Sequence, residues 1–459
     1  SSYVKKNRKL CTFMKISIDN HSYYNFKEIR GYINFMHHPS ELLKNTLEDF
    51  FSVEVNYNFS PLLDNDLLAL IQNNPKRNVY VDNNNQVSLL ITVNPISDAH
   101  YLFVIQLKGN SIGLENRPKI FNVMASCISK SLTESYADSF TKAIWLLGDV
   151  LIKRFISLFV GKGVYNSYKI HSSIDFFTRL RSTTFEGKYF SSGLIVTKSI
   201  YDYKDSSNNH FGILQSLYTC SKLFSRIDTR YWYLVDGYSS FYLTDLKKDI
   251  HYVFINSDTD PSYLNRVLLK NVLMGSDLLF RVENGRDLSI VTSKGYEFIH
   301  QENVWRFRNY DMLQALIQAK VKLSDSVYNS LLYYVLYCSK HDISSIIWVP
   351  AYISKVQPLL KSFHSFTRSS FNIMDRNYSG LVKRMMSSDG ATIISVDGTV
   401  KYYGCIVNMD SAKVNAVKGT GETVASLLAS NGVAFKISQD GTIKVFLNAV
   451  SYTHLRAHE

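Results

Sequence analysis

The stretch from Asp389 to Phe446 constrains the fold more than any other part of the sequence. Asp397-Gly398 and Asp440-Gly441 each lie between runs of β-branched and aromatic residues. This arrangement is the strongest short-range signal for a β-hairpin, because the turn needs positive φ angles. The predicted strand pairs are Ala391–Val396 with Thr399–Val407, and Val433–Ser438 with Thr442–Leu447.

A glycine-rich turn, Gly419-Thr420-Gly421, lies between the two hairpins. We expect Thr420 to cap a helix that runs to about Ser430 and ends at Asn431-Gly432. The free backbone N–H groups at a helix start bind anions readily. Such a turn is nevertheless more often a simple cap than a phosphate site, so it needs a second feature to indicate function.

That second feature is Asp389-Gly390-Ala391, which comes directly before the first predicted strand. If this motif meets the glycine-rich turn, the site combines a carboxylate for a divalent cation with amides for phosphates. Nucleotidyl transfer needs this combination, because its catalysis is mostly positioning and charge stabilisation.

The order of predicted helices and strands divides the chain into three regions. Residues 1–160 mix short strands and helices, which predicts an α+β domain. Residues 161–304 are rich in strands, including one expected at Tyr231–Val235, and fit a sensor-like domain or a purely structural one equally well. From residue 305 to 449, helices alternate with buried strands, which indicates an α/β domain. A further helix is expected at Val356–Phe363.

The last ten residues, Val450–Glu459, resemble one reading frame of a sequencing adapter. We therefore expect a non-native tail and leave it out of the fold prediction. The native sequence is expected to continue differently after Ala449, and the missing initial Met suggests that it also extends before Ser1.

Composition and charge indicate which binding partners and which cellular compartment the protein suits. The net charge is +12, but the lysines and arginines form no run. This favours small anionic partners such as nucleotides over a nucleic-acid surface. The five cysteines have no zinc-type spacing, which fits a reducing, cytoplasmic location. The most apolar window, Ala143–Val160, contains three charged residues, so no membrane span is expected.

In the order of these motifs, residues 305–447 resemble the diadenylate cyclase domain, the nucleotide-binding domain of the DNA integrity scanning protein family. The similar segments, in chain order, are Leu331–Val349, Asp389-Gly390-Ala391, Gly419-Thr420, Ile437 to Gly441 and Val445-Phe446. The resemblance implies a mixed sheet with flanking helices. It also implies condensation of two ATP molecules, held in facing protomers with Mg²⁺ or Mn²⁺, to cyclic di-AMP and pyrophosphate.

The resemblance implies a role for each matching residue. Asp389 would bind the metal ion and help to activate the 3′-hydroxyl group, and Thr420 would contact a phosphate. Gly390 and Ala391 would offer backbone contacts near the nucleotide. The complete expected nucleotide-binding set is Gly390, Ala391, Lys418, Gly419, Thr420, Gly421 and Ser438.

The sequence departs from the family where Arg-His-Arg usually follows Gly-Thr, because Gly421-Glu422-Thr423 stands there instead. Gln439 also replaces a usual acidic residue, and Lys418 is the nearest candidate for a replacement cation. Glu422 could hold a metal ion, or it could be an ordinary first-turn carboxylate. Three hypotheses remain open: a divergent, regulated cyclase, a catalytically silent sensor of ATP or a cyclic dinucleotide, and a structural scaffold.

Overall fold

The structure, a computed structural model, divides into two compact units, Ser1–Lys162 and Gly163–Glu459. It describes residues 39–51, 54–60, 79–81, 87–93, 100–106, 117–135, 146–161, 165–205, 212–221, 227–245, 250–256, 269–270, 272–283, 285, 287–301, 303–366, 370–409, 419–439, 441–447 and 450–456. Each unit is a mixture of helices and sheets, as the α/β prediction requires.

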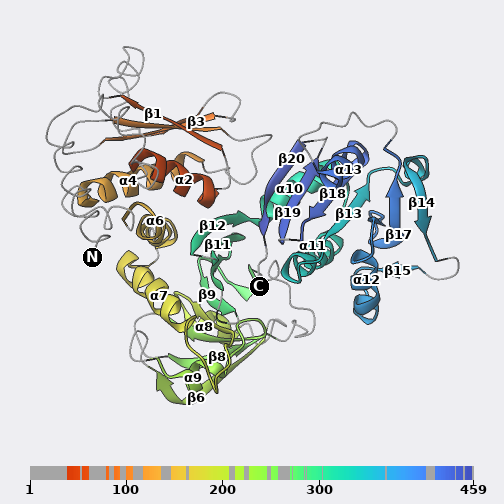
Figure 1. Cartoon of the computed structure of the whole chain (residues 1–459). Helices are drawn as coiled ribbons and strands as arrows, with labels where there is room; N and C mark the ends of the chain where they lie inside the picture. The colour runs from red at the N-terminus through yellow and green to blue at the C-terminus, as the bar shows by residue number, and fades with distance from the viewer. Residues whose placement is uncertain are drawn as a thin grey trace, which may run out of the picture. The chain divides into compact units, whose positions relative to one another are not determined.

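The first unit contains a four-stranded antiparallel sheet in the order β1-β4-β3-β2 (Figure 1). Helix α2 packs against β1, and α4 packs against β2, β3 and α6. Phe50, Phe51, Phe121 and Phe155 form edge-to-face pairs in the core. The elements are α2 (Pro39–Phe51), β1 (Glu54–Ser60), β2 (Val79–Val81), β3 (Val87–Val93), β4 (His100–Gln106), α4 (Arg117–Ser135) and α6 (Asp149–Gly161).

The second unit begins with an eight-stranded sheet in the order β12-β11-β10-β9-β5-β7-β8-β6, which is antiparallel except for the pair β5-β7. Its helices are α7 (Ser167–Leu180), α8 (Ile200–Asp205) and α9 (Thr229–Tyr233). Its strands are β5 (Ser192–Val196), β6 (Ile213–Ser221), β7 (Ser240–Thr244), β8 (Ile250–Ile255), β9 (Leu278–Glu283), β10 (Asp287–Thr292), β11 (Tyr296–Gln301) and β12 (Val304–Asn309).

The strand predicted at Tyr231–Val235 is wrong, because helix α9 occupies most of this segment. The side chain of Asp228 accepts hydrogen bonds from the backbone N–H groups of Arg230 and Tyr231 and caps the helix. A local cap of this kind outweighs the strand preference of the aromatic run that follows it.

The C-terminal sheet is mixed, with the order β14-β17-β16-β13-β18-β19-β20, and β15 pairs with β17. Strands β13 and β16 are parallel, and β13 and β18 are antiparallel. The strands are β13 (Ser345–Pro350), β14 (Leu360–His364), β15 (Phe371–Asn372), β16 (Ala391–Ile394), β17 (Thr399–Val407), β18 (Gly432–Ile437), β19 (Thr442–Leu447) and β20 (Val450–Arg456). The helices are α10 (Tyr310–Lys320), α11 (Asp325–Lys340), α12 (Ser379–Met386) and α13 (Thr420–Leu428), with 3₁₀ turns η5 (Ile353–Lys355), η6 (Gln357–Leu359), η7 (Arg376–Tyr378) and η8 (Ala429–Asn431).

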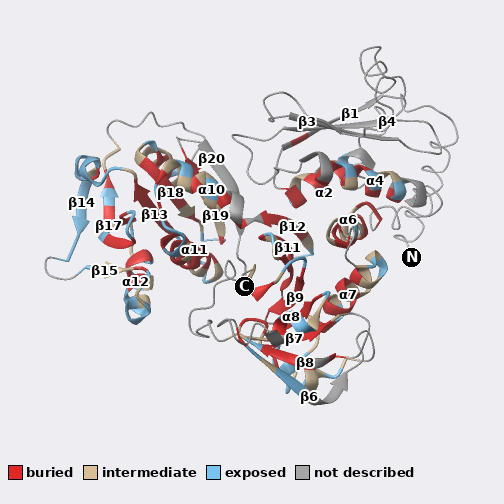
Figure 2. Cartoon of the chain, turned by 180° about the vertical axis from the view of Figure 1, so that it is seen from behind, coloured by how far each residue is buried: buried red, intermediate tan, exposed pale blue. Residues whose placement is uncertain are grey.

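Alternate residues of the central strand β13 build two cores, one on each face of this sheet. Figure 2 shows buried residues in both the strands and the helices of this domain. Ile347 and Val349 pack with α10, α11 and α12, whereas Ile346 and Trp348 pack with α13. A strand buried on both faces reads as a continuous apolar run, as Ile346–Val349 does. The result is a three-layered α/β domain.

One predicted helix is wrong, and the segment that the fold prediction left out is part of the sheet. The helix predicted at Val356–Phe363 is a 3₁₀ turn followed by the exposed strand β14, which pairs with β17. The segment expected to be a non-native tail forms the edge strand β20 beside β19. An open sheet edge offers unpaired N–H and C=O groups to any extended segment, so this pairing depends on backbone groups and not on the tail's sequence.

Polar contacts join the two sheets of the second unit. The Tyr310 hydroxyl donates a hydrogen bond of 2.7 Å to buried Glu297, and the Lys340 ammonium lies 2.6 Å from Glu283. These contacts link helices α10 and α11 of the C-terminal domain to the sheet that precedes it. Among the described helices, none has the length and apolar character needed to cross a bilayer.

Candidate functional site

The strand pairings bring most of the predicted site residues to one end of the C-terminal sheet. We call the end at which the parallel strands β13 and β16 begin the amino end, and the opposite end the carboxyl end. Ala391 pairs with Ile346 near the start of β13, and Ser345 pairs with Ile437. Asp389, Gly390, Ala391 and Ser438 therefore all lie at the amino end.

Asp389 is held there by the end of helix α12. The hydroxyls of Ser388 and Thr392 donate hydrogen bonds of 2.6 and 3.0 Å to the carbonyl oxygen of Met385. Ser345 donates one of 2.6 Å to the carbonyl oxygen of Met386. These bonds tie the last turn of α12 to β13 and β16. The exposed carboxylate of Asp389 is thus positioned by a rigid support.

The backbone conformation explains why a glycine is needed in the Asp-Gly-Ala motif. Gly390 has φ +93°, and a Cβ at this position would lie 2.5 Å from the backbone oxygen of Cys405 on β17. Only glycine avoids both penalties. Its N–H donates a 2.9 Å hydrogen bond to one carboxylate oxygen of Asp389, which orients that side chain.

The start of helix α13 also lies at the amino end. A Cβ on Gly421 would lie 2.7 Å from Cε of Lys436, near the end of β18. The prediction that Thr420 caps this helix is wrong. The N-cap residue is Gly419, which has no side chain to form a capping hydrogen bond, and Thr420 is the first residue of the helix. Gly419 and Thr420 are exposed, so the first N–H groups of α13 face outward and can receive an anion.

Two lysines that the sequence analysis did not select stand beside this helix start. Lys436 follows Ala434 by two residues on β18, and Lys444 precedes Phe446 by two residues on β19. Ala434 and Phe446 belong to the core that contains α13, so the period of a strand places both lysines on the same face. The Lys436 ammonium donates hydrogen bonds of 2.9 Å to Ser344 Oγ and 2.7 Å to the carbonyl oxygen of Ile437.

Glu422 forms an ion pair with one of these lysines. Its carboxylate lies 2.5 Å from Nζ of Lys444, and both side chains are partly exposed. A metal ion at Glu422 would have to compete with this lysine. Among the residues that the structure describes, no group of three His, Cys, Asp or Glu side chains could hold a metal ion. The metal role of Glu422 stays a prediction, and so does that of Asp389.

The site therefore has an acidic side and a basic side. Strand β13 separates β16 from β18, so about 10 Å lies between the strand that Asp389 precedes and the strand that carries Lys436. A triphosphate can span this distance. Lys418 lies outside the described residues, so its predicted role remains untested.

A thiol nucleophile at this site is disfavoured. Cys405 pairs with Ala391 across β16 and β17 and is buried, which raises the pKa of its thiol to about 12. The reactive form of cysteine is the thiolate, which is scarce at neutral pH when the pKa is this high. Cys127, Cys338 and Cys405 are all free and buried.

Comparisons with known proteins add no name to this arrangement. No protein-family model matches the sequence, and no curated protein matches it.

Proposed function

We propose that residues 305–447 form a diadenylate cyclase-type nucleotidyltransferase domain that condenses two ATP molecules to cyclic di-AMP and pyrophosphate. One observation carries the proposal: Asp389, the exposed start of α13, and Lys436 with Lys444 meet at one end of one sheet. Nucleotidyl transfer needs a carboxylate on one side of the phosphates and hydrogen-bond donors and cations on the other.

In this proposal, each residue acts by position and charge. The N–H groups of Thr420 and Gly421 and the ammonium group of Lys436 hold the triphosphate. Asp389 lies beside the 3′-hydroxyl of the second ATP, which a facing protomer supplies. The 3′-hydroxyl gives its proton to the Asp389 carboxylate as its oxygen attacks the α-phosphorus, the bond from the α-phosphorus to the β-phosphate oxygen breaks, and pyrophosphate leaves. Repetition of the step in the opposite sense closes the ring.

A divalent cation fits the residues present. Mg²⁺ is commonly bound by one or two carboxylates together with substrate phosphates, so exposed Asp389 suffices on the protein side. Mg²⁺ or Mn²⁺, when bound, would neutralise phosphate charge. Lys436 and Lys444 would supply the positive charge that the family's Arg-His-Arg provides, from strands instead of the helix start.

The test is formation of cyclic di-AMP from ATP with Mn²⁺ or Mg²⁺, followed by chromatography and mass spectrometry. We expect product from the wild type and at least about a 100-fold loss in Asp389→Asn, which keeps the size of the side chain. Asp375→Asn, a change at the partly exposed cap of η7, is the matched control and is expected to keep full activity. Absence of product with every metal tried would contradict the proposal.

A catalytically silent nucleotide sensor is the second candidate, and the ion pair between Glu422 and Lys444 favours it. The pair neutralises one of the two strand lysines, which lowers the stabilisation available to a transition state. A sensor would bind ATP or a cyclic dinucleotide without turnover. Calorimetry that detects no affinity for any of these nucleotides would exclude this candidate.

A further inference from the structure

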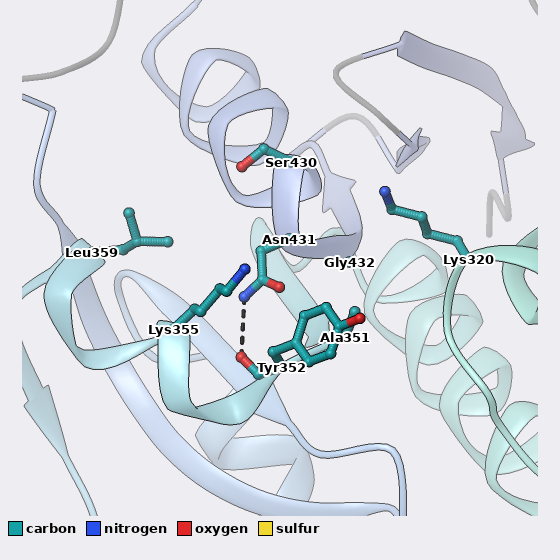
Figure 3. Close-up of a pocket in the computed structure, with 8 residues that line it drawn as sticks. All are labelled: Lys320, Ala351, Tyr352, Lys355, Leu359, Ser430, Asn431 and Gly432. Carbon is teal, nitrogen blue, oxygen red and sulfur yellow. Dashed lines mark hydrogen bonds between the residues drawn. The ribbon is translucent and has the colours of Figure 1, made fainter.

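A cavity of about 460 Å³ opens at the carboxyl end of the C-terminal sheet, opposite the candidate active site (Figure 3). It is lined by Lys320, Ala351, Tyr352, Lys355, Leu359, Ser430, Asn431 and Gly432. Small-molecule sites have volumes of about 300–1,000 Å³, so the cavity can hold a nucleotide-sized ligand. None of its lining residues belongs to the proposed cyclase site.

The position of the cavity is one that favours ligand binding. It lies where β13 ends and β18 begins, at the carboxyl end of the parallel pair β13-β16. In open α/β sheets, ligands bind in the crevice outside the carboxyl ends of the strands.

The charge of the cavity selects an anion. Among the described residues that line it, two are lysines and none is acidic. Lys320 comes from the end of α10 and Lys355 from η5, and Figure 3 shows the two side chains on opposite sides of Asn431 and Gly432. Two cations about a concave site attract phosphate groups strongly, because the walls exclude part of the screening water.

The aromatic wall adds selectivity for a flat ring. Tyr352 is 62% exposed, and the Lys355 ammonium lies 5.0 Å from the centre of its ring. An exposed ring of this kind can stack on a nucleobase.

The cavity is also held in shape before any ligand binds. Asn431 donates a side-chain hydrogen bond of 3.1 Å to the carbonyl oxygen of Tyr352, and Ala351 N–H donates one of 3.0 Å to the carbonyl oxygen of Asn431. A Cβ on Gly432 would lie 2.1 Å from the carbonyl oxygen of Val349, so the backbones of strands β18 and β13 approach closely here. A preformed site loses less entropy when it binds.

We propose that this cavity is a second, non-catalytic site for a phosphate-bearing nucleotide, with the phosphate between Lys320 and Lys355 and the base on Tyr352. The inference does not depend on the proposed cyclase activity, because it uses neither Asp389 nor the start of α13. A nucleotide here would contact η8, which directly continues helix α13. Its occupancy can therefore act on the far end of the helix whose start receives the triphosphate.

The test is photolabelling of the full chain with 8-azido-AMP, which has one phosphate and a flat base, followed by peptide mapping. EDTA is included so that metal-dependent binding at Asp389 is excluded. We expect label in residues 351–359 or 429–432, and inorganic pyrophosphate should compete with it. Lys320→Gln with Lys355→Gln should reduce labelling about 10-fold or more, and Tyr352→Leu should reduce it while pyrophosphate still binds.

Lys322→Gln is the matched control, because Lys322 is exposed, close to Lys320 and outside the cavity lining. It should label like the wild type. Thermal unfolding of each variant establishes that the fold is intact. Labelling only at the amino end, no labelling at all, or unchanged labelling in the double lysine variant would each overturn the proposal.

Discussion

The two ends of the C-terminal sheet carry different kinds of evidence. The amino end has Asp389 and the start of α13, whose order in the sequence suggests chemistry, together with two strand lysines that only the structure brings there. The carboxyl end has a cavity of about 460 Å³ whose residues form no motif. Both ends are cationic, but only the amino end places a carboxylate beside its cations. The difference separates the site that we propose for nucleotidyl transfer from a site that could only bind a phosphate group.

The largest difference between the two ends is expected when the two lysines of the amino end are removed. In Lys436→Gln with Lys444→Gln, we expect the rate of cyclic di-AMP formation to fall about 100-fold, since one lost transition-state donor costs 10²–10³-fold in comparable sites. Photolabelling of the carboxyl end should be unchanged. Equal losses at both ends would mean that the two sites are not separate. Lys401→Gln, an exposed lysine on β17, is the control.

Both ends depend on a glycine with a positive φ angle, so alanine should destabilise each. Gly390→Ala and Gly432→Ala would each bring Cβ within 2.5 Å of a backbone oxygen. We expect losses of about 1–3 kcal/mol in the free energy of unfolding, measured by urea denaturation. Gly419→Ala is the control, because it has φ −60° and open space, and should change stability by less than about 1 kcal/mol. A stable Gly390→Ala protein would refute the packing described at the Asp-Gly-Ala motif.

Two roles are possible for Glu422 at the amino end: it neutralises Lys444, or it binds a metal ion. If it only neutralises Lys444, then Glu422→Gln frees a cation and should tighten ATP binding several-fold, by about 1 kcal/mol. If it holds a metal ion, the same change should abolish metal-dependent turnover. Calorimetry with ATP, with and without Mn²⁺, separates the two results. We expect the first, because the carboxylate already lies against the lysine.

The smallest effect concerns the first hairpin turn, at the carboxyl end. Hydrogen bonds from Ser395 and from the Thr399 N–H hold the pKa of Asp397 below its ordinary value of 3.8. A lowered folded-state pKa stabilises the fold above pH 3.8 and loses this contribution as the pH falls through the folded pKa. Asp397→Asn should therefore cost about 1 kcal/mol or less at pH 7. The difference from wild type should shrink with acidification, and a difference that grows would contradict this assignment.

The hairpins could be predicted because their turns are local. Gly398 and Gly441 have φ angles of +85° and +75°, as Asp-Gly turns require, and the strands follow within a residue or two of the predicted bounds. The prediction at Tyr231 was wrong although the deciding feature is also local, because the cap at Asp228 starts a helix where the aromatic run predicts a strand.

The lysine pair and the cavity could not be predicted in the same way. The sequence places Lys436 and Lys444 on one face of a hairpin, but only the packing shows that α13 covers that face. The cavity combines residues from α10, from the turns after β13 and from η8 and the start of β18, and the first and last of these, Lys320 and Gly432, are more than 100 positions apart. No local pattern relates residues at such separations.

The rate of cyclic di-AMP formation, measured side by side in the wild type and in two double variants, tests the central claim most directly. The account predicts product from the wild type and about a 100-fold loss in Lys436→Gln with Lys444→Gln. It predicts a basal rate within about two-fold of wild type in Lys320→Gln with Lys355→Gln, because the carboxyl end holds no reacting group. No product from the wild type, or equal losses in the two variants, would contradict it.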